Sequence, residues 1–206
     1  FTATCEVNVV EGTGNYELMN DADTISAGDT IVIASSSNGA VAGDINSSSV
    51  MAKVDQTFTN NNATIEDLAT SAIEFTVGGS EGAWTLANQD GKLLGATAAK
   101  KLAWDSGTTK WSITISSSGA TIQSTTSTYG RILYNVGSPR FTTYTSATTT
   151  SLTLPTIYRL DSSSNQSSGY EEVITTITTS VATFSDATER ASDPSDLTSL
   201  KAALQN

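Results

Sequence analysis

The side chains that most often carry out catalysis are scarce in this chain, and none is arranged for it. Histidine is absent and Cys5 is the only cysteine, so the commonest general base is missing. A nucleophilic serine would need a lysine or carboxylate as its base, but no Ser-x-x-Lys motif occurs, and Ser199 and Lys201 are too close in sequence to face each other on a helix. Glycoside hydrolysis needs two convergent carboxylates, whereas the acidic residues here are mostly isolated beside turns. We therefore expect no enzymatic activity.

Two further groups of residues have chemical potential. The run Asn20–Thr24 brings several oxygen ligands together, but it lacks the glycine and the distal glutamate of an EF-hand loop, so we interpret it as a polar turn. The tryptophans Trp84, Trp104 and Trp111 have the flat faces on which sugars stack, but each falls at an apolar position of a repeat, which favours core packing. We expect neither a metal ion nor a cofactor.

Composition limits the partners and the compartment. Roughly a third of the 206 residues are Ser or Thr, and the formal net charge is −11. Such an acidic, lysine-poor chain lacks the clustered cations that nucleic-acid binding requires. No apolar run approaches the ~20 residues of a membrane span. A single cysteine allows no disulfide within the chain and is most simply a small apolar residue of a strand.

A threefold internal repeat is the strongest structural signal. Three stretches, which begin at Asn38, Asp90 and Tyr129, share the pattern turn residue, glycine, any residue, then two small or aliphatic residues. A further apolar residue follows eleven positions after each glycine. Repetition at one spacing indicates three copies of a unit that cannot bury its apolar face alone. We therefore expect Val41, Leu93 and Ile132 to be equivalent under a threefold axis.

Each repeat contains the signals of four strands. An aromatic-x-aliphatic strand opens each unit, at Tyr16, Phe75 and Trp111, and the signature recurs once more at Tyr158. A second strand, the glycine-led strand and a fourth strand follow in each unit, which gives thirteen expected strands in all. Residues 55–71 appear as an insertion that lengthens the first unit. Many short strands separated by turns predict a closed antiparallel β structure, in which closure removes exposed sheet edges.

The central part of the chain resembles a known family. The segments Leu93-Leu94, Lys101–Trp104, Lys110–Ile113 and Gly119–Ile122 are similar to the β-trefoil repeat of ricin-type lectins, and the resemblance extends from Tyr16 to Leu160. It implies a β-trefoil of three four-stranded units, in which a thirteenth, terminal strand would be accessory. A weaker likeness, over Tyr129–Tyr144, to modules of secreted multidomain proteins of Bacteroidetes-type bacteria implies an extracellular or cell-surface location.

The same resemblance implies a place for a carbohydrate. Shallow sugar sites would lie just beyond the glycine-led strands, where Asp44 and Asn135 offer polar groups and Tyr134 a stacking face. The equivalent stretch of the second unit, Gly95-Ala96-Thr97, is bare of such groups.

Both ends of the chain differ from the repeats. Residues 1–14 contain a segment in which Ala3, Cys5, Val7 and Val9 alternate with polar residues, which predicts a strand with one buried face. The repeat domain covers residues 15–161, and residues 162–169 form a Ser-rich linker.

Residues 170–206 form a tail with helical signals. Its apolar residues Val173, Ile177, Val181 and Phe184 follow at helical spacing, although the high Thr content favours strands instead. Asp193 and Pro194 are typical of the start of a second helix. We expect two helices.

Two functional hypotheses follow. A trefoil needs no extra strand, and an isolated strand with one apolar face must pair somewhere, so we interpret the chain as a non-enzymatic structural or adhesive subunit. It would associate with copies of itself, with the capacity to form filaments, through Ala3, Cys5, Val7, Val9, Val173, Ile177, Val181 and Phe184. The alternative is a carbohydrate-binding, lectin-like module that uses Asp44, Tyr134 and Asn135.

Overall fold

A computed structural model of the chain describes residues 14–146 and 150–161. These residues all belong to the first of the two units into which the chain divides, Phe1–Ser162. The predicted N-terminal strand, the Ser-rich linker and the predicted helical tail lie outside the described residues.

The described part of the chain is mainly β, as predicted, and all its strand pairings are antiparallel. Two short 3-10 turns, η1 (Ser36–Asn38) and η2 (Ser127–Tyr129), interrupt the strands, and no α-helix occurs among these residues. The fifteen strands are β1 (Tyr16–Leu18), β2 (Thr30–Ser35), β3 (Ala40–Ile45), β4 (Met51–Asp55), β5 (Thr64–Ile65), β6 (Phe75–Ser80), β7 (Ala83–Ala87), β8 (Leu94–Ala98), β9 (Lys101–Trp104), β10 (Trp111–Ser116), β11 (Gly119–Ser124), β12 (Arg131–Asn135), β13 (Arg140–Tyr144), β14 (Leu152–Thr153) and β15 (Thr156–Leu160).

Thirteen of these strands occupy the places predicted from the repeat. The two that the repeat does not predict are β5, which lies within the insertion of the first unit, and β14, which follows the third unit. Both contain only two residues, too few to show an alternating pattern in the sequence.

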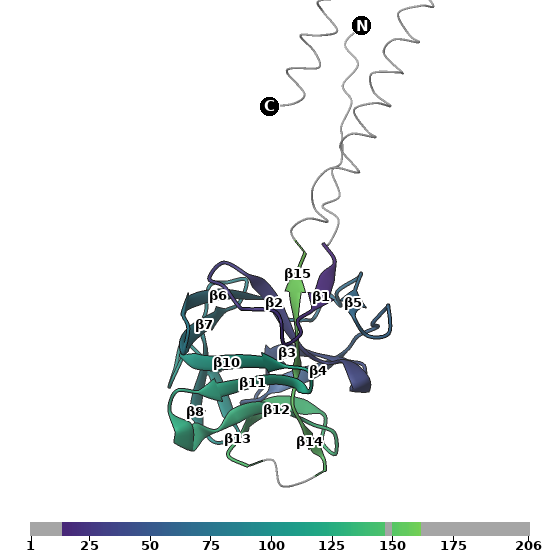
Figure 1. The fold of residues 1–206 in the computed structure, drawn as a ribbon. Coiled ribbons are helices and arrows are strands. Elements are labelled where there is room, and N and C mark those ends of the chain that lie inside the picture. The colour runs from purple at the N-terminus through teal and green to yellow at the C-terminus, as the bar shows by residue number, and fades with distance from the viewer. Residues whose placement is uncertain (1–13, 147–149, 162–206) are drawn as a thin grey trace, which may run out of the picture. The chain divides into compact units, whose positions relative to one another are not determined.

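Six strands form a ring. In the order β15, β2, β6, β7, β10 and β11, each strand is hydrogen-bonded to the next. The two end strands of this series also meet, because the backbone N–H of Ala120 in β11 donates to the carbonyl of Pro155, the residue before β15, over 2.7 Å. Figure 1 shows β10 and β11 side by side across the domain, with β15 running beside β2.

Three hairpins, β3–β4, β8–β9 and β12–β13, connect successive ring strands. Each hairpin contacts the other two. Strand β13 pairs with β4, the N–H of Leu102 donates to the Ser49 carbonyl over 2.7 Å, and the N–H of Lys100 donates to the Thr143 carbonyl over 2.8 Å. The same arrangement of two ring strands and one hairpin therefore occurs three times.

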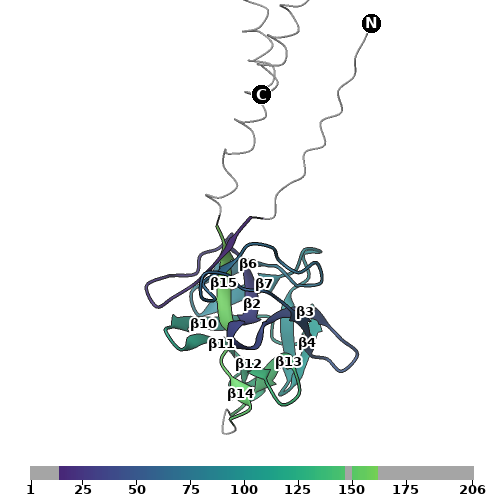
Figure 2. The same ribbon diagram turned by 90° about the vertical axis from the view of Figure 1, so that its right-hand side faces the viewer.

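Strand β1 lies outside the ring, although it carries the aromatic-x-aliphatic signature. It pairs with β15 on one edge, where Tyr16 lies opposite Leu160, and with β5 on the other, where Tyr16 lies opposite Ile65. The C-terminal copy of the signature, β15, takes the ring position instead. Figures 1 and 2 both place β1 beside β15 at one end of the domain and β14 at the opposite end.

Side chains from all six ring strands and the three hairpins fill a central core, which includes Trp111, Phe75, Leu86, Ile122 and Phe141. A second, smaller cluster lies on the outer face of the ring and contains Tyr16, Val32, Ala34, Val41, Ile65, Ala72 and Tyr158. Strand β2 is thus buried on both faces, which explains its uninterrupted apolar run from Ile31 to Ala34.

The predicted equivalence of Val41, Leu93 and Ile132 is wrong by one residue in two of the units. The residues that enter the central core are Ala42, Leu94 and Ile132, whereas Val41 belongs to the outer cluster and Leu93 is half-exposed. In the first two hairpins the inward residue is three positions after the glycine, and in the third it is two. A one-residue change of register moves a strand residue to the opposite face, so an alignment on glycine alone cannot identify the inward residue.

The contrast between two tryptophans tests this core. Trp111 is fully buried and its indole N–H donates to the Leu94 carbonyl over 2.9 Å. We expect Trp111→Phe to lower the free energy of unfolding by about 2–3 kcal/mol, because it leaves a small cavity and an unsatisfied buried carbonyl. In the matched variant Trp104→Phe, the lost bond is to the exposed side chain of Asp44, and we expect a loss of about 1 kcal/mol or less. Urea denaturation of both variants measures the difference, and equal losses would contradict this picture of the core.

Candidate functional site

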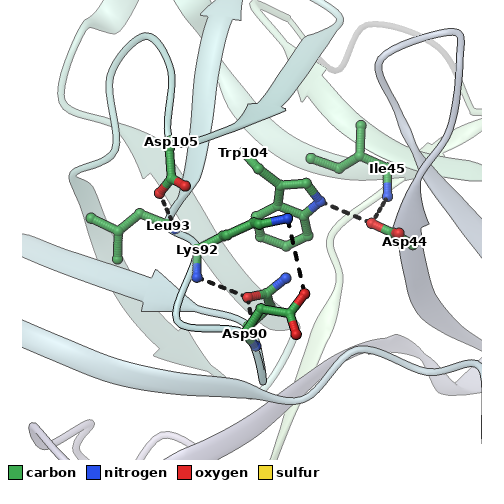
Figure 3. Close-up of polar contacts among 8 residues, drawn as sticks. Asp44, Ile45, Asp90, Lys92, Leu93, Trp104 and Asp105 are labelled. Carbon is green, nitrogen blue, oxygen red and sulfur yellow. Dashed lines mark hydrogen bonds and ion pairs between the residues drawn. The ribbon is translucent and has the colours of Figure 1, made fainter.

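Of the residues predicted to bind sugar, Asp44 makes the most informative contact. Its side chain is exposed on β3, and its Oδ1 accepts a hydrogen bond of 2.9 Å from the indole Nε1–H of Trp104 in β9. The same oxygen accepts the N–H of Ile45 over 2.6 Å. The contact joins the first repeat unit to the second, and Figure 3 shows the carboxylate at the N–H edge of the indole. Because both bonds use Oδ1, Asp44 Oδ2 remains available to a ligand.

A β-bulge orients Asp44. The register of β3 against β4 changes between Ala42, which lies opposite Lys53, and Ile45, which lies opposite Met51. Gly43 and Asp44 are the residues within this irregularity. A bulge adds an unpaired residue and redirects the side chains beside it, which is why bulges are common next to functional sites.

Trp104 lies between the core and the solvent. Its ring centroid is 6.3 Å from that of Phe75, so one side of the indole packs against the central core, while the residue as a whole is only partly buried. The prediction that the tryptophans are core residues is confirmed for Trp84 and Trp111 and is incomplete for Trp104. A signal in the sequence was available, since the charged turn residue Asp105 follows Trp104 directly and marks the end of its strand.

Charged residues of an adjacent loop surround Trp104. Asp105 Oδ1 accepts the N–H of Leu93 over 2.8 Å, and the N–H of Asp105 donates to the Leu93 carbonyl over 2.8 Å. Next along the loop, Lys92 Nζ lies 4.0 Å from Asp90 Oδ2. Figure 3 shows both sets of contacts around the indole. Since these charged side chains are exposed and the ion pair spans 4.0 Å, they act as adaptable polar groups at the edge of the aromatic face.

Asn88 holds this loop in place. Its Oδ1 accepts the backbone N–H groups of Asp90 and Lys92 over 3.1 and 2.9 Å. An asparagine side chain that bonds to the backbone two residues ahead is a standard means of fixing a turn. The loop beside Trp104 is therefore ordered by its own sequence.

Tyr134 does not offer a stacking face, and this part of the predicted sugar site is wrong. The residue is 2% exposed, and its ring packs in the central core with its centroid 4.8 Å from that of Phe141. The glycine-led strand β12 points Tyr134 inward for the same reason of register that places Ile132 inward two residues earlier.

Asn135 has a structural role at the β12–β13 turn. Its Nδ2 donates to the Tyr144 hydroxyl over 3.0 Å, and its Oδ1 accepts the N–H of Ser138 over 3.0 Å. These bonds use the polar groups that a sugar would need. The three predicted residues thus belong to separate contacts, and only Asp44 is part of an exposed aromatic and polar cluster.

The run Asn20–Thr24 is a turn whose polar groups bond internally and to the ring. Asp23 Oδ2 accepts the N–H of Asn20 over 2.8 Å, and Asp23 Oδ1 lies 3.6 Å from a guanidinium nitrogen of Arg159 in β15. Across residues 14–146 and 150–161, no group of three His, Cys, Asp or Glu side chains is placed to hold a metal ion. Within the same ranges, no helix has the length and apolar character to cross a bilayer.

The residues predicted to mediate self-association lie outside the described residues. They are Ala3, Cys5, Val7, Val9, Val173, Ile177, Val181 and Phe184.

Comparison with known proteins returns no relative. No protein-family model matches this chain, and no curated protein matches it at a significant level.

The burial of Tyr134 has a consequence at alkaline pH. Burial raises the pKa of its phenol above the ordinary value of about 10, the nearby Lys53 ammonium opposes this, and the Asp55 carboxylate adds to it. The folded chain keeps this proton at a pH at which the unfolded chain has lost it, so stability falls as the pH rises above about 10.

We expect Tyr134→Phe to reduce this alkaline loss of stability. Urea denaturation at several pH values between about 8 and about 11 measures the effect. Burial also raises the pKa of Tyr158, so part of the alkaline loss should persist in Tyr134→Phe. An unchanged pH dependence would show that Tyr134 is exposed in solution.

Proposed function

We propose that residues 15–161 form a β-trefoil that acts as a non-enzymatic, extracellular carbohydrate-binding module, with Trp104 and Asp44 at the centre of its site. The six-stranded ring with three hairpins supports the trefoil, since two ring strands and one hairpin recur three times. The similarity of the repeats to ricin-type lectins supports the extracellular setting and the class of ligand. Because fold alone does not establish a function, the proposal depends on the site.

The contact between Trp104 and Asp44 carries the proposal. A partly exposed indole provides an apolar face on which a pyranose ring can stack, and the adjacent carboxylate provides an acceptor for its hydroxyl groups. Lys92 and Asp90 add a donor and a further acceptor at the rim. Small-molecule sites commonly combine an aromatic surface with a few placed polar groups in this way.

The charges at the site select among saccharides. Three carboxylates, from Asp44, Asp90 and Asp105, surround the indole, against the single ammonium of Lys92. The chain as a whole carries a formal charge of −11. Like charges repel, so sulfated and uronic glycans are disfavoured and neutral saccharides are the expected ligands.

A glycan array followed by calorimetric titration tests this function. We expect neutral saccharides to bind, and Trp104→Ala or Asp44→Ala to weaken binding by at least about tenfold, equivalent to about 1.4 kcal/mol. Asn135→Ala is the matched control and should leave affinity unchanged, because its side chain holds a turn. An array without hits, or binding that survives Trp104→Ala, would refute the proposal.

A second candidate is that the chain is a structural or adhesive subunit that associates with copies of itself through its terminal segments. The described body is poorly suited to association by itself, since Val136 is its only exposed large hydrophobic residue. The β1–β15 ladder continues beyond the two strands, where the N–H of Asp161 donates to the Asn15 carbonyl over 2.8 Å. Both flanking segments therefore begin at adjacent backbone positions, an arrangement that suits a domain displayed by an assembly of its flanks.

Size-exclusion chromatography of the full chain beside a truncated chain of residues 15–161 tests the second candidate. We expect the full chain to elute as concentration-dependent oligomers and the truncated chain to remain monomeric, because the apolar faces predicted for association lie in the removed segments. A full chain that stays monomeric at high concentration would exclude it. Electron microscopy of the oligomers would distinguish closed rings from filaments.

A further inference from the structure

The site at Trp104 coincides with the greatest departure from threefold repetition. The bulge at Gly43 and Asp44 interrupts the first hairpin at the place where β12, in the third hairpin, keeps a continuous register with its partner. The connection from β4 to β6 in the same unit carries the insertion, residues 56–74, which is much longer than the connection from β9 to β10. Both irregular features belong to the unit that supplies Asp44.

The insertion docks directly on the bulge. Ala72, near the end of the insertion, forms a β-bridge with Gly43, and the N–H of Ile73 donates to the Ala42 carbonyl over 2.9 Å. These two contacts involve the residues immediately before Asp44. The backbone that carries the carboxylate is thus held from β4 on one side and from the insertion on the other.

A buried glutamine makes the insertion firm enough to serve as a support. Gln56 is 8% exposed, its Nε2 donates to the carbonyls of Thr57 and Asp67 over 2.7 and 2.9 Å, and its Oε1 accepts the N–H of Ala69 over 2.8 Å. The two ends of the insertion are therefore tied together by one side chain. A buried amide with its bonds satisfied rigidifies the backbone segments that it joins.

Gly43 is the point at which this support reaches the strand. A Cβ atom at this position would lie 2.7 Å from Val54 Cγ2 and 3.2 Å from the Ser71 carbonyl oxygen. The first distance is shorter than real Cβ contacts and the second requires the insertion to move. Close approach of two backbones is one of the few reasons for which a strand needs glycine.

We propose that the insertion, acting through Gly43, is a positioning element that directs Asp44 toward Trp104 and so sets the geometry of the binding site. This inference rests on the proposed function for its link to a ligand. The positioning itself concerns only the hydrogen bond between the indole and the carboxylate. Gly43 and Gln56 act through Asp44 and do not touch the ligand.

The experiment follows the Trp104 indole N–H by nuclear magnetic resonance in the full chain, with Trp104→Phe to assign the signal. Asp44→Ala gives the position of the signal when the hydrogen bond is lost. We expect Gly43→Ala to move the signal toward that position and to weaken saccharide binding about tenfold. Gly137→Ala is the matched control, because a Cβ there meets only ordinary contacts at 3.6 and 3.7 Å, and it should change neither readout.

Two further variants cover the case in which Gly43→Ala does not fold. Adding Val54→Ala removes the closest predicted contact and should return the signal toward its original position. Gln56→Leu loosens the insertion without altering β3 and should shift the signal in the same direction as Gly43→Ala. A folded Gly43→Ala or Gln56→Leu variant with an unchanged indole signal would overturn the proposal.

The indole signal also separates the two proposals. If no saccharide binds, the proposed function fails, while the signal still reports whether the insertion positions Asp44. If saccharides bind and the signal of both variants is unchanged, the positioning role fails and the binding function stands.

Discussion

The need of every ring strand for a partner on both edges is the constraint on which the rest of this structure depends. Thr- and Val-rich strands with open edges invite association with other chains. The contact between Ala120 and Pro155 joins the first and last strands of the ring and removes its open edge. Once the ring is closed, the connections between its strands must leave it as hairpins, and the three hairpins meet because each can bury its apolar face only against the others.

Closure also explains where the irregular features lie. The ring and the meeting hairpins are repeated and are held by backbone hydrogen bonds, so they tolerate little change. Insertion, bulge and accessory strand are instead found on the outside, where β1, β5 and the insertion cover the outer face of β2 with a second apolar cluster. Departures from the repeat thus gather around the first unit, and there the Trp104–Asp44 contact joins two units through side chains.

The strands were predictable because each is a local property. The glycine-led pattern and the aromatic-x-aliphatic signature identified thirteen of the fifteen strands, and the Ser- and Thr-rich turns separated them. The register was less accessible, since one residue of difference in a turn exchanges inward and outward faces, as at Val41 and Leu93. Which of the two terminal aromatic strands enters the ring was open in the sequence, because both carry the same signature.

The sequence by itself determined that the chain is built from a threefold repeat of antiparallel strands, because turn residues and apolar alternation act over a few residues. It also identified Asp44 as an exposed polar group. Only the tertiary structure decided that Tyr134 is buried, that Asn135 holds a turn and that Trp104 is the partner of Asp44. Asp44 and Trp104 are 60 residues apart, and only the meeting of hairpins from different units and the bulge at Gly43 bring them together.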